Sequence, residues 1–596
     1  MNKPFHDNKT TEISSLDRPV PAGVNAAAFG SDVAADALRA TDIPYIALNP
    51  GASYRGFHDS LVNYLGNSKP QMLLCLHEES AVAIAQGWAK VTGRAMAAMV
   101  HSNVGLMHAT MAVFNAWCDR MPVVLLGATG PVDSVKRRPW IDWIHTAADQ
   151  GALIRGYSKW DDQPASAPAA YEAILRANWI ANTAPRGPTY VNLDAGMQEA
   201  KLSEPFAAPD AKRLMPEVAD AAPAAMIEKA AALLRVAKRP VILAGRVSRS
   251  EAAWEARVAL AERLGAQVVT DLKVGAAFPT DHPLHAGEPS TIAPVTEALD
   301  ALRAADVIVS LDWVDLAGTL AKHVGEHNAK IIQVTVDHQL HNGWSLDYQG
   351  LPPIDVLLAC EPDTAVVALI DALGAGKGNI PAKERPEFRP TGDKLNVDYV
   401  AVALRKALGE RPVSLTHLPL SWDGRSWPFR HPLDYLGGDG GGGIGGGPGI
   451  SVGAALALKG SGRMAVAICG DGDFLMGVTA LWTAAHYRIP LLMVVANNRS
   501  FFNDELHQER VARMRNRPIE NRWVGQRISK PDIDLAAMAR AQGATAFGPV
   551  TKIDELASVF TKAIAAVEAG EVVVIDTRVE PGYSPAMTAV MTRKSD

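Results

Sequence analysis

The sequence predicts an α/β protein built from three doubly wound parallel-sheet domains. Short apolar runs rich in Val and Ile recur along the chain, and helix-length segments separate them. Strands that are apolar throughout are typical of parallel sheets covered by helices on both faces. Two stretches rich in Pro, Ala, Gly and charged residues, 196–225 and 374–396, interrupt this alternation and are interpreted as linkers. They leave three parts of ordinary domain size.

Each part contains a series of predicted strands. The first domain is expected over residues 26–195, with strands at YIALNPG, AAMVHSN, PVVLLGA and TYVNLDA and a helix at SAVAIAQGWAKVTG. The middle domain is expected over 215–373, with strands at RPVILAGR, AQVVTDL, VIVSLDW and KIIQVTVD. The last domain is expected over 397–585, with strands at MAVAICGD, LLMVVANN and EVVVIDTR. Residues 1–25 form a polar tail that lacks the apolar core of a signal peptide.

Composition narrows the classes of partner and compartment. The 596 residues include 58 Lys and Arg against 64 Asp and Glu, a net charge of −6, and the sequence has no long basic cluster. A nucleic-acid partner is therefore not expected. A membrane partner is not expected either, because no stretch reaches the roughly 18 apolar residues of a membrane span. The four cysteines are far apart and form no CxxC pair, which predicts a cytoplasmic protein without disulfides or a zinc site.

The segment 470–500, GDGDFLMGVTALWTAAHYRIPLLMVVANNRS, places oxygen donors after two successive predicted strands. Asp471 follows one strand and Asn498 the next, and a right-handed strand–helix–strand unit brings both to one sheet edge. With the Ser500 backbone carbonyl they offer the oxygen ligands that Mg²⁺ prefers. Gly472 would let the backbone approach a phosphate at a helix N-terminus. An ordinary Rossmann-like unit with turn residues at its strand ends is the alternative.

GDG followed by NN after a helix and a strand resembles the signature of the thiamine diphosphate (ThDP)-dependent decarboxylases and carboligases. The resemblance covers nearly the whole chain after residue 25 and implies pyrimidine-binding, central and diphosphate-binding domains in that order. It implies ThDP and Mg²⁺ as cofactors, with Asp471, Asn498 and the Ser500 carbonyl around the metal. Asp473 stands where many members have Ser, so it is expected beside the cofactor but not among the metal ligands.

A second motif, CLHEESAVAIAQGWAKVTG, supplies the acid that the resemblance requires. Glu78 lies nine residues before Gly87, at a predicted strand-to-helix junction. The resemblance implies that Glu78 binds N1′ of the aminopyrimidine and thereby favours loss of the C2 proton of the thiazolium ring. The adjacent Glu79 is the rival residue. An acid-rich first turn also suits the dipole of any helix, so a purely structural role is the alternative.

The glycine-rich run GGDGGGGIGGGPGISVGAALALKG (437–460) could be a flexible linker or a dinucleotide fingerprint. A helix follows it at once, unlike in a linker, and no strand leads directly into it, unlike in the fingerprint. By resemblance Ile444 supports ThDP in its bent shape, and the Gly442 carbonyl accepts from the N4′ amino group. Thr416 and His417 are weaker candidates for contacts with the diphosphate.

The substrate side is most similar to benzoylformate decarboxylase. His101 matches the position of an active-site histidine that relays protons, although a lone histidine at a strand end is more often structural. Asn103 is a neighbour that could position substrate. The decarboxylase has Ser directly after NPG, whereas this chain has Ala52 there and Ser53 one place later. A second active-site histidine is missing from the central segment SLDWVDLAG, where Trp313 lies instead.

The sequence therefore predicts a ThDP- and Mg²⁺-dependent enzyme, similar to benzoylformate decarboxylase, that cleaves a 2-oxo acid beside its carbonyl, with or without carboligation. An acetolactate synthase-type carboligase on pyruvate, a non-catalytic ThDP-binding paralogue and a nicotinamide oxidoreductase are the alternatives. FAD is not expected as a cofactor, because PVILAGRVSRS (240–250) has a single glycine after its strand. Because family sites join domains of two subunits, the resemblance implies a homodimer at least, with a homotetramer favoured.

Overall fold

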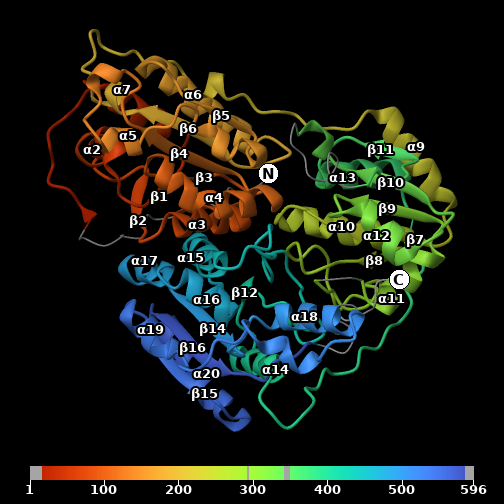
Figure 1. Cartoon of the computed structure of the whole chain (residues 1–596). Coiled ribbons are helices and arrows are strands. Elements are labelled where there is room, and N and C mark those ends of the chain that lie inside the picture. The colour runs from red at the N-terminus through yellow and green to blue at the C-terminus, as the bar shows by residue number, and fades with distance from the viewer. Residues whose placement is uncertain (1–16, 292–293, 341–349, 377, 584–596) are drawn as a thin grey trace.

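The computed structural model describes residues 17–291, 294–340, 350–376 and 378–583, which form three α/β lobes (Figure 1). Each lobe is built around one sheet of five or six strands. All strand pairs within these sheets are parallel. The predicted fold class, three doubly wound parallel-sheet domains, is confirmed.

The first lobe contains a six-stranded sheet in the order β2-β1-β3-β4-β6-β5. Residues 202–215, in the stretch interpreted as a linker, also pack on this lobe. Helices α1, α2 and α6 cover one face of the sheet, and α3 and α4 cover the other. The bounds are β1 (Tyr45–Leu48), β2 (Gln71–Leu74), β3 (Met96–Val100), β4 (Val123–Thr129), β5 (Trp160–Asp162), β6 (Thr189–Asp194), α1 (Gly30–Ala40), α2 (Arg55–Asp59), α3 (Glu78–Thr92), α4 (Ser102–Cys118), α5 (Ile141–Ile144), α6 (Ala167–Asn182), α7 (Ala195–Glu199) and α8 (Ala211–Leu214).

The central lobe contains a five-stranded sheet in the order β11-β10-β9-β7-β8. Helices α9, α10 and α13 pack on one face, and α11 and α12 pack on the other. The bounds are β7 (Pro240–Ala244), β8 (Gln267–Val269), β9 (Val307–Leu311), β10 (Lys330–Val334), β11 (Val356–Leu358), α9 (Ala224–Val236), α10 (Glu251–Leu264), α11 (Thr296–Ala304), α12 (Leu316–Thr319) and α13 (Pro362–Leu373).

The third lobe contains a five-stranded sheet in the order β12-β13-β14-β16-β15. Helices α14 and α20 cover one face, and α15, α17 and α19 cover the other. The bounds are β12 (Val413–His417), β13 (Met464–Gly470), β14 (Leu491–Asn497), β15 (Thr545–Val550), β16 (Val572–Arg578), α14 (Val397–Leu408), α15 (Gly446–Leu458), α16 (Asp471–Gly477), α17 (Ala480–His486), α18 (Phe502–Met514), α19 (Leu535–Ala541) and α20 (Leu556–Glu568).

One hydrophobic core joins the first and third lobes. It contains residues of both sheets and of the helices α3, α4, α15, α16, α17 and α19. Helices α3 and α15 cross in the middle of this layer (Figure 1). A methyl group at Gly87 would clash with the Ile450 carbonyl oxygen, and one at Gly453 would clash with the Ile84 carbonyl oxygen. The two glycines therefore allow the helix backbones to touch.

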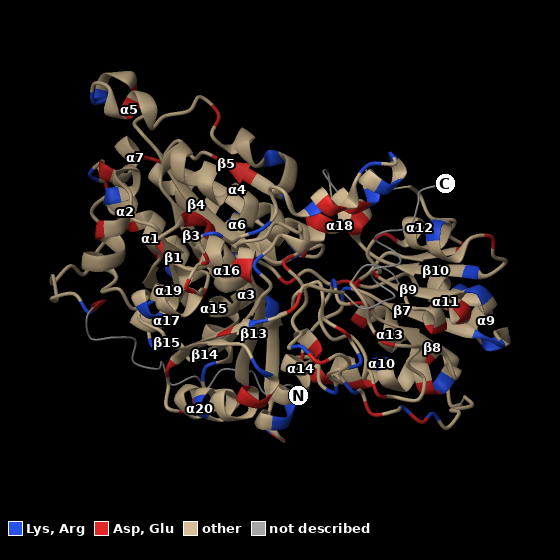
Figure 2. Ribbon diagram, turned by 60° about the horizontal axis from the view of Figure 1, so that its bottom comes forward, with Lys and Arg blue, Asp and Glu red and all other residues tan. Residues whose placement is uncertain are grey.

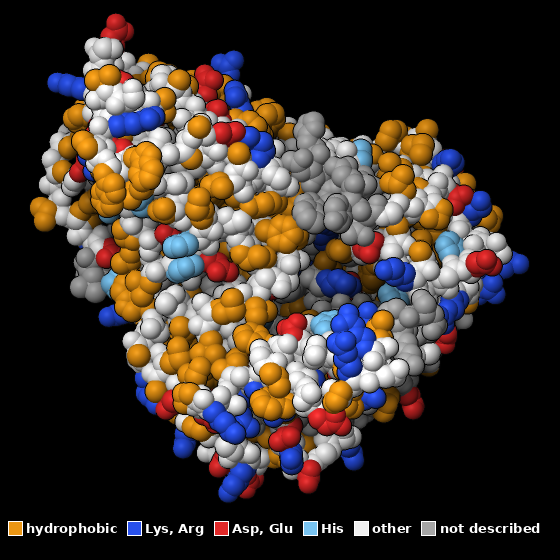
Figure 3. Space-filling model, viewed as in Figure 1, with side chains coloured by type: hydrophobic (Ala, Val, Ile, Leu, Met, Phe, Trp, Pro, Cys, Tyr) orange, Lys and Arg blue, Asp and Glu red, His pale blue; other side chains and the backbone are white. Residues whose placement is uncertain are grey.

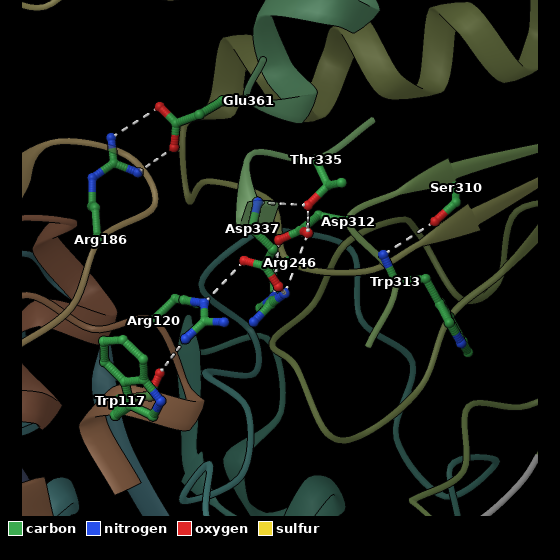
Figure 4. A network of polar contacts seen from close by, with 10 residues as sticks. All are labelled: Trp117, Arg120, Arg186, Arg246, Ser310, Asp312, Trp313, Thr335, Asp337 and Glu361. Atoms are coloured by element: carbon green, nitrogen blue, oxygen red, sulfur yellow. Dashed lines mark hydrogen bonds and ion pairs between the residues drawn. The ribbon is translucent and has the colours of Figure 1, made fainter. Parts of the chain in front are cut away.

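Ion pairs connect the first and central lobes (Figure 4). The Arg246 guanidinium, after β7, donates to Asp337 Oδ2 at 2.6 Å and to Asp312 Oδ2 at 2.9 Å. Arg120, after α4 of the first lobe, donates to Asp337 Oδ1 at 3.1 Å. These groups lie where β7, β9 and β10 end, at the sheet edge where doubly wound folds bind nucleotides. Charged protein side chains thus occupy this part of the edge.

The charge pattern is mixed in all three lobes. Acidic and basic residues are interspersed over the ribbon in Figure 2. Within the described parts of the chain, no helix combines the length and the apolar character needed to cross a lipid bilayer.

The glycine crossing leads to a stability prediction. Gly453→Ala should lower the free energy of unfolding by about 1 to 3 kcal/mol, because the added methyl group forces two packed backbones apart. Alanine has the higher helix propensity, so a loss would have to come from packing. Thermal unfolding of the variant against wild type measures this effect. Gly156→Ala is the matched control, because Gly156 is exposed and its added methyl group would touch nothing. Equal melting temperatures for Gly453→Ala and wild type would contradict the crossing.

Candidate functional site

The three residues expected around a metal come together at the carboxyl edge of the third sheet. The Ser500 N–H donates to Asp471 Oδ2 at 3.2 Å and to Asn498 Oδ1 at 2.9 Å. The Gly472 N–H donates to Asp471 Oδ1 at 2.9 Å. Burial raises the pKa of Asp471 to about 6, although backbone N–H groups oppose this rise. A carboxylate and an amide oxygen thus converge where β13 and β14 end.

Gly472 is the second residue of α16 and lies against the aromatic ring of Phe501. A methyl group at Gly472 would collide with this ring at 2.6 Å. Its missing side chain therefore makes room for Phe501 directly beside the predicted metal ligands.

Asp473 turns away from these ligands and binds the glycine-rich turn. Its Oδ1 accepts from the Gly445 N–H at 2.7 Å and the Gly447 N–H at 3.2 Å. These N–H groups belong to the start of α15, so Asp473 caps this helix from outside its own sequence. His417 Nε2 lies 3.3 Å from Asp473 Oδ2, which brings two of the predicted cofactor-binding residues into contact.

The glycine turn carries one large side chain. Ile444 is 44% exposed, and Gly442 has a φ of +71° with open space around it. Asn115 of α4 holds the turn, since its Oδ1 accepts from the Gly441 N–H at 3.2 Å and its Nδ2 donates to the Gly443 carbonyl at 3.4 Å. Residues of the first and third lobes therefore hold the glycine turn in place.

Thr416 has no exposed surface. Its hydroxyl bonds to Ser451 Oγ at 3.0 Å and to the Val466 carbonyl at 3.3 Å. The structure therefore places Thr416 in the protein interior, between β12, β13 and α15, while the neighbouring His417 reaches Asp473.

Glu78 and Glu79 open α3 and face different neighbours. Glu78 is 8% exposed, and its Oε2 lies 3.1 Å from Nδ1 of His108 on α4. The Glu79 carboxylate lies beside Gly445 of the glycine turn and has a buried oxygen, Oε1, with no hydrogen-bond partner. Burial, and then the charge of Asp473, raise the pKa of Glu79.

The substrate-side candidates Ser53 and His101 are in contact. Ser53 Oγ lies 2.9 Å from His101 Nδ1, and the Ser53 N–H donates to the same nitrogen at 3.3 Å. The imidazole of His145 packs beside His101 with a ring-centroid distance of 4.7 Å. Asn103 lies in the first turn of α4 and has a buried Oδ1 with no hydrogen-bond partner.

Trp313 makes its contacts within the central lobe. It is 4% exposed, and its indole Nε1 donates to Thr319 Oγ1 at 3.0 Å. The Lys273 ammonium lies 5.8 Å from the ring centre. These contacts give Trp313 a packing role at the end of β9.

The residues present fit a magnesium-bound diphosphate. Asp471 and Asn498 supply hard oxygen donors at one point, and the glycine turn leaves open space beside Gly442. The N-termini of α15 and α16 add partial positive charge. On the face shown in Figure 3, Lys, Arg and His side chains gather around a hollow where the three lobes meet.

Comparison of the sequence with models of protein families identifies the enzyme family of this chain. Three models of the thiamine pyrophosphate enzymes match in order: the N-terminal TPP binding domain over residues 29–153, the central domain over 227–342 and the C-terminal TPP binding domain over 420–577. The chain belongs to the thiamine pyrophosphate enzyme family. Thiamine pyrophosphate is another name for ThDP, so the family predicted from the GDG and NN motifs is confirmed.

Relatives of this ThDP enzyme include decarboxylases and carboligases. Benzoylformate decarboxylase of Pseudomonas aeruginosa is 26% identical over 520 residues, covering 83% of this chain and 89% of the relative. The acetolactate synthase large subunit of Corynebacterium glutamicum is 27% identical over 472 residues, covering 75% and 71%. The predicted enzyme class, a ThDP-dependent decarboxylase or carboligase, is confirmed.

Solved structures agree on the fold of this ThDP enzyme. The 4-hydroxybenzoylformate decarboxylase of Rhodococcus jostii superposes with a TM-score of 0.77 at 22% identity, covering 94% of this chain and all of that one. Benzoylformate decarboxylase of Polynucleobacter necessarius also gives 0.77, at 20% identity, covering 93% and 99%.

Sequence reasoning missed three residues that contact the candidate site: His108 at Glu78, Asn115 at the glycine turn and His145 at His101. His108 and Asn115 lie on α4, the helix that begins directly after His101. The polar residues of that helix could therefore have been recognised in the sequence as candidates for the site. The segment around His145 has no such pattern.

The cap on α15 can be tested in the ThDP-free protein. Asp473→Ala should destabilise the start of α15 by roughly 0.5 to 2 kcal/mol, the usual effect of losing an N-cap acceptor. Hydrogen–deuterium exchange of the backbone at residues 440–449 should speed up accordingly. Asp473→Asn keeps an acceptor oxygen and should show a smaller increase. If Asp473 served only to contact the cofactor, exchange in the ThDP-free variants would match wild type.

Proposed function

We propose that the chain is a Mg²⁺- and ThDP-dependent decarboxylase of a 2-oxo acid of the benzoylformate type, with carboligation as a possible second outcome. The observation that carries this proposal is the convergence of Asp471, Asn498 and Ser500 at one sheet edge. The similarity to benzoylformate decarboxylase over 83% of the chain supports the substrate class. When bound, ThDP supplies a thiazolium ring that accepts the electron pair of the bond broken beside the carbonyl.

In this proposal the third lobe holds the cofactor. The Asp471 carboxylate, the Asn498 amide oxygen and the Ser500 carbonyl oxygen would hold Mg²⁺, and the metal would supply positive charge for the diphosphate. The Gly442 carbonyl would accept a hydrogen bond from the aminopyrimidine, and the exposed Ile444 side chain would support the bound cofactor. His417 and Asp473 stabilise the turn that carries these two residues.

The first lobe supplies the residues that transfer protons. Glu78 would bind N1′ of the aminopyrimidine and share a proton with it when the cofactor is bound. His101 presents Nε2 to the substrate because Ser53 binds its Nδ1. Ser53 thereby orients the histidine, and Asn103 offers a free buried acceptor nearby.

The positions of Glu78 and Glu79 support an assembly of two or more subunits. The Glu79 carboxylate, rather than that of Glu78, lies beside the glycine turn of its own chain. We infer that Glu78 serves a ThDP molecule held by a second subunit, in a homodimer at least, with a homotetramer favoured.

The four cysteines are free thiols, which supports a cytoplasmic location.

The test is turnover of two 2-oxo acids by the ThDP- and Mg²⁺-loaded protein. We expect benzaldehyde and CO₂ from benzoylformate, identified by NMR. Glu78→Gln should abolish turnover and still bind ThDP, because the variant keeps the fold but cannot hold the N1′ proton. Acetolactate from pyruvate alone would favour the acetolactate synthase-type reaction, and absence of any product would contradict the proposal. Glu79→Gln is the matched control and should keep turnover.

Mixed subunits test which chain supplies Glu78. Glu78→Gln and Asp471→Asn homomers should each be inactive. Co-expressed, they should regain part of the activity, because a site shared between subunits then recovers both wild-type residues in some combinations. No regained activity in a purified mixed assembly would indicate that each site is built from one chain.

A further inference from the structure

His101 and His145 form a pair of imidazoles on the first lobe. Their ring centroids are 4.7 Å apart and the ring planes are inclined by 43°. His101 ends the loop between β3 and α4, and His145 directly follows α5. Two histidines from different segments therefore lie side by side, and His101 also contacts the substrate-side residue Ser53.

The hydrogen bonds of His101 determine its tautomer. The Ser53 N–H can only donate, and it points at Nδ1 from 3.3 Å, so Nδ1 is an acceptor. Ser53 Oγ accepts from the Ser102 N–H at 3.2 Å and lies 2.9 Å from the same nitrogen, to which its hydroxyl donates. Neutral His101 therefore carries its ring proton on Nε2.

The hydrogen bond of His145 determines the opposite tautomer. Its Nδ1 lies 2.8 Å from the carbonyl oxygen of Ile141, which can only accept. Neutral His145 therefore carries its proton on Nδ1 and has a lone pair on Nε2. The pair thus offers one donor nitrogen and one acceptor nitrogen, as an acid and a base acting on one substrate would.

The surroundings disfavour a state in which both imidazoles are positively charged. Burial, then His145, lower the pKa of His101; Arg138 lowers it further, while Glu78 on α3 raises it. Arg138 is itself held by Asp142, with Nη2 2.8 Å from Oδ1. Two adjacent imidazolium ions would repel each other in this half-buried position.

We propose that His145 is the second acid–base residue on the substrate side, paired with His101 in place of the central-lobe histidine that the chain lacks. The proposal rests on the proposed function. His101 donates a hydrogen bond from Nε2 to a substrate oxygen and keeps its proton. His145 takes one proton from water at Nε2 and gives it to the carbon from which CO₂ has left. One proton is thus consumed for each 2-oxo acid converted to aldehyde and CO₂.

The test compares ThDP-loaded wild type with His145→Gln, which cannot titrate. We expect kcat for benzoylformate to fall by about 100-fold, the usual loss when a general acid is removed. KM should change less, and one ionisation should disappear from the pH profile of kcat. The pKa of His101 should rise, because the nearby positive charge of His145 is gone. Exchange of the histidine C2 hydrogen, followed by mass spectrometry, measures this pKa residue by residue.

His431→Gln is the matched control, because His431 of the third lobe pairs with Glu251 of the central lobe, outside the candidate site, and should change none of these quantities. An unchanged pH profile, or an unchanged pKa of His101, in His145→Gln would overturn the pairing even if turnover fell. ThDP binding by His145→Gln checks that the variant is folded. Wild type that turns over no 2-oxo acid would overturn the proposed function, whereas the titration of His101 would still decide whether the two rings are coupled.

Discussion

The contact between α3 and α15 is the constraint on which the site depends. At Gly87 and Gly453 the two helices touch through their backbones, and the helix starts lie side by side, with Glu79 next to Gly445. The positive ends of both helix dipoles therefore point toward one region. Glu78, Glu79 and Asp473 supply negative charge there, and the glycine turn supplies free space. The same crossing fuses the cores of the first and third lobes, so close packing sets the position of Glu79 relative to the glycine turn of its own chain.

In the proposed function, this arrangement divides the chemistry between lobes. The third lobe presents oxygen ligands and the glycine turn, whereas the first lobe presents Glu78, His101 and His145. The central lobe contributes ion pairs through Arg246 and Asp337 and anchors the end of α4 through Arg120. Helix α4 begins directly after His101 and carries His108, which contacts Glu78, and Asn115, which holds the glycine turn. It therefore links His101, Glu78, the glycine turn and the central lobe.

Much of the fold, and the convergence of Asp471 and Asn498, could be predicted from sequence, because both follow from local patterns and sheet topology. Asp471 and Asn498 end successive parallel strands, so topology alone brings them to one edge. Contacts between distant segments were not predictable in this way. Asp473 was expected beside the cofactor, and the structure binds it to Gly445 and Gly447. Thr416 was a candidate contact for diphosphate, and its hydroxyl is used inside the protein. His145 reaches His101 from a loop whose path no periodicity reveals.

The central claim is that a single metal at the third sheet ties ThDP to this chain. Anomalous diffraction from crystals grown with ThDP and Mn²⁺, which accepts the same oxygen ligands as Mg²⁺, tests it most directly. The account predicts one strong peak within bonding distance of the Asp471 carboxylate, the Asn498 amide oxygen and the Ser500 carbonyl. A peak at another cluster of potential ligands, such as His417, Cys469 and Asp473, with none at Asp471, would contradict it.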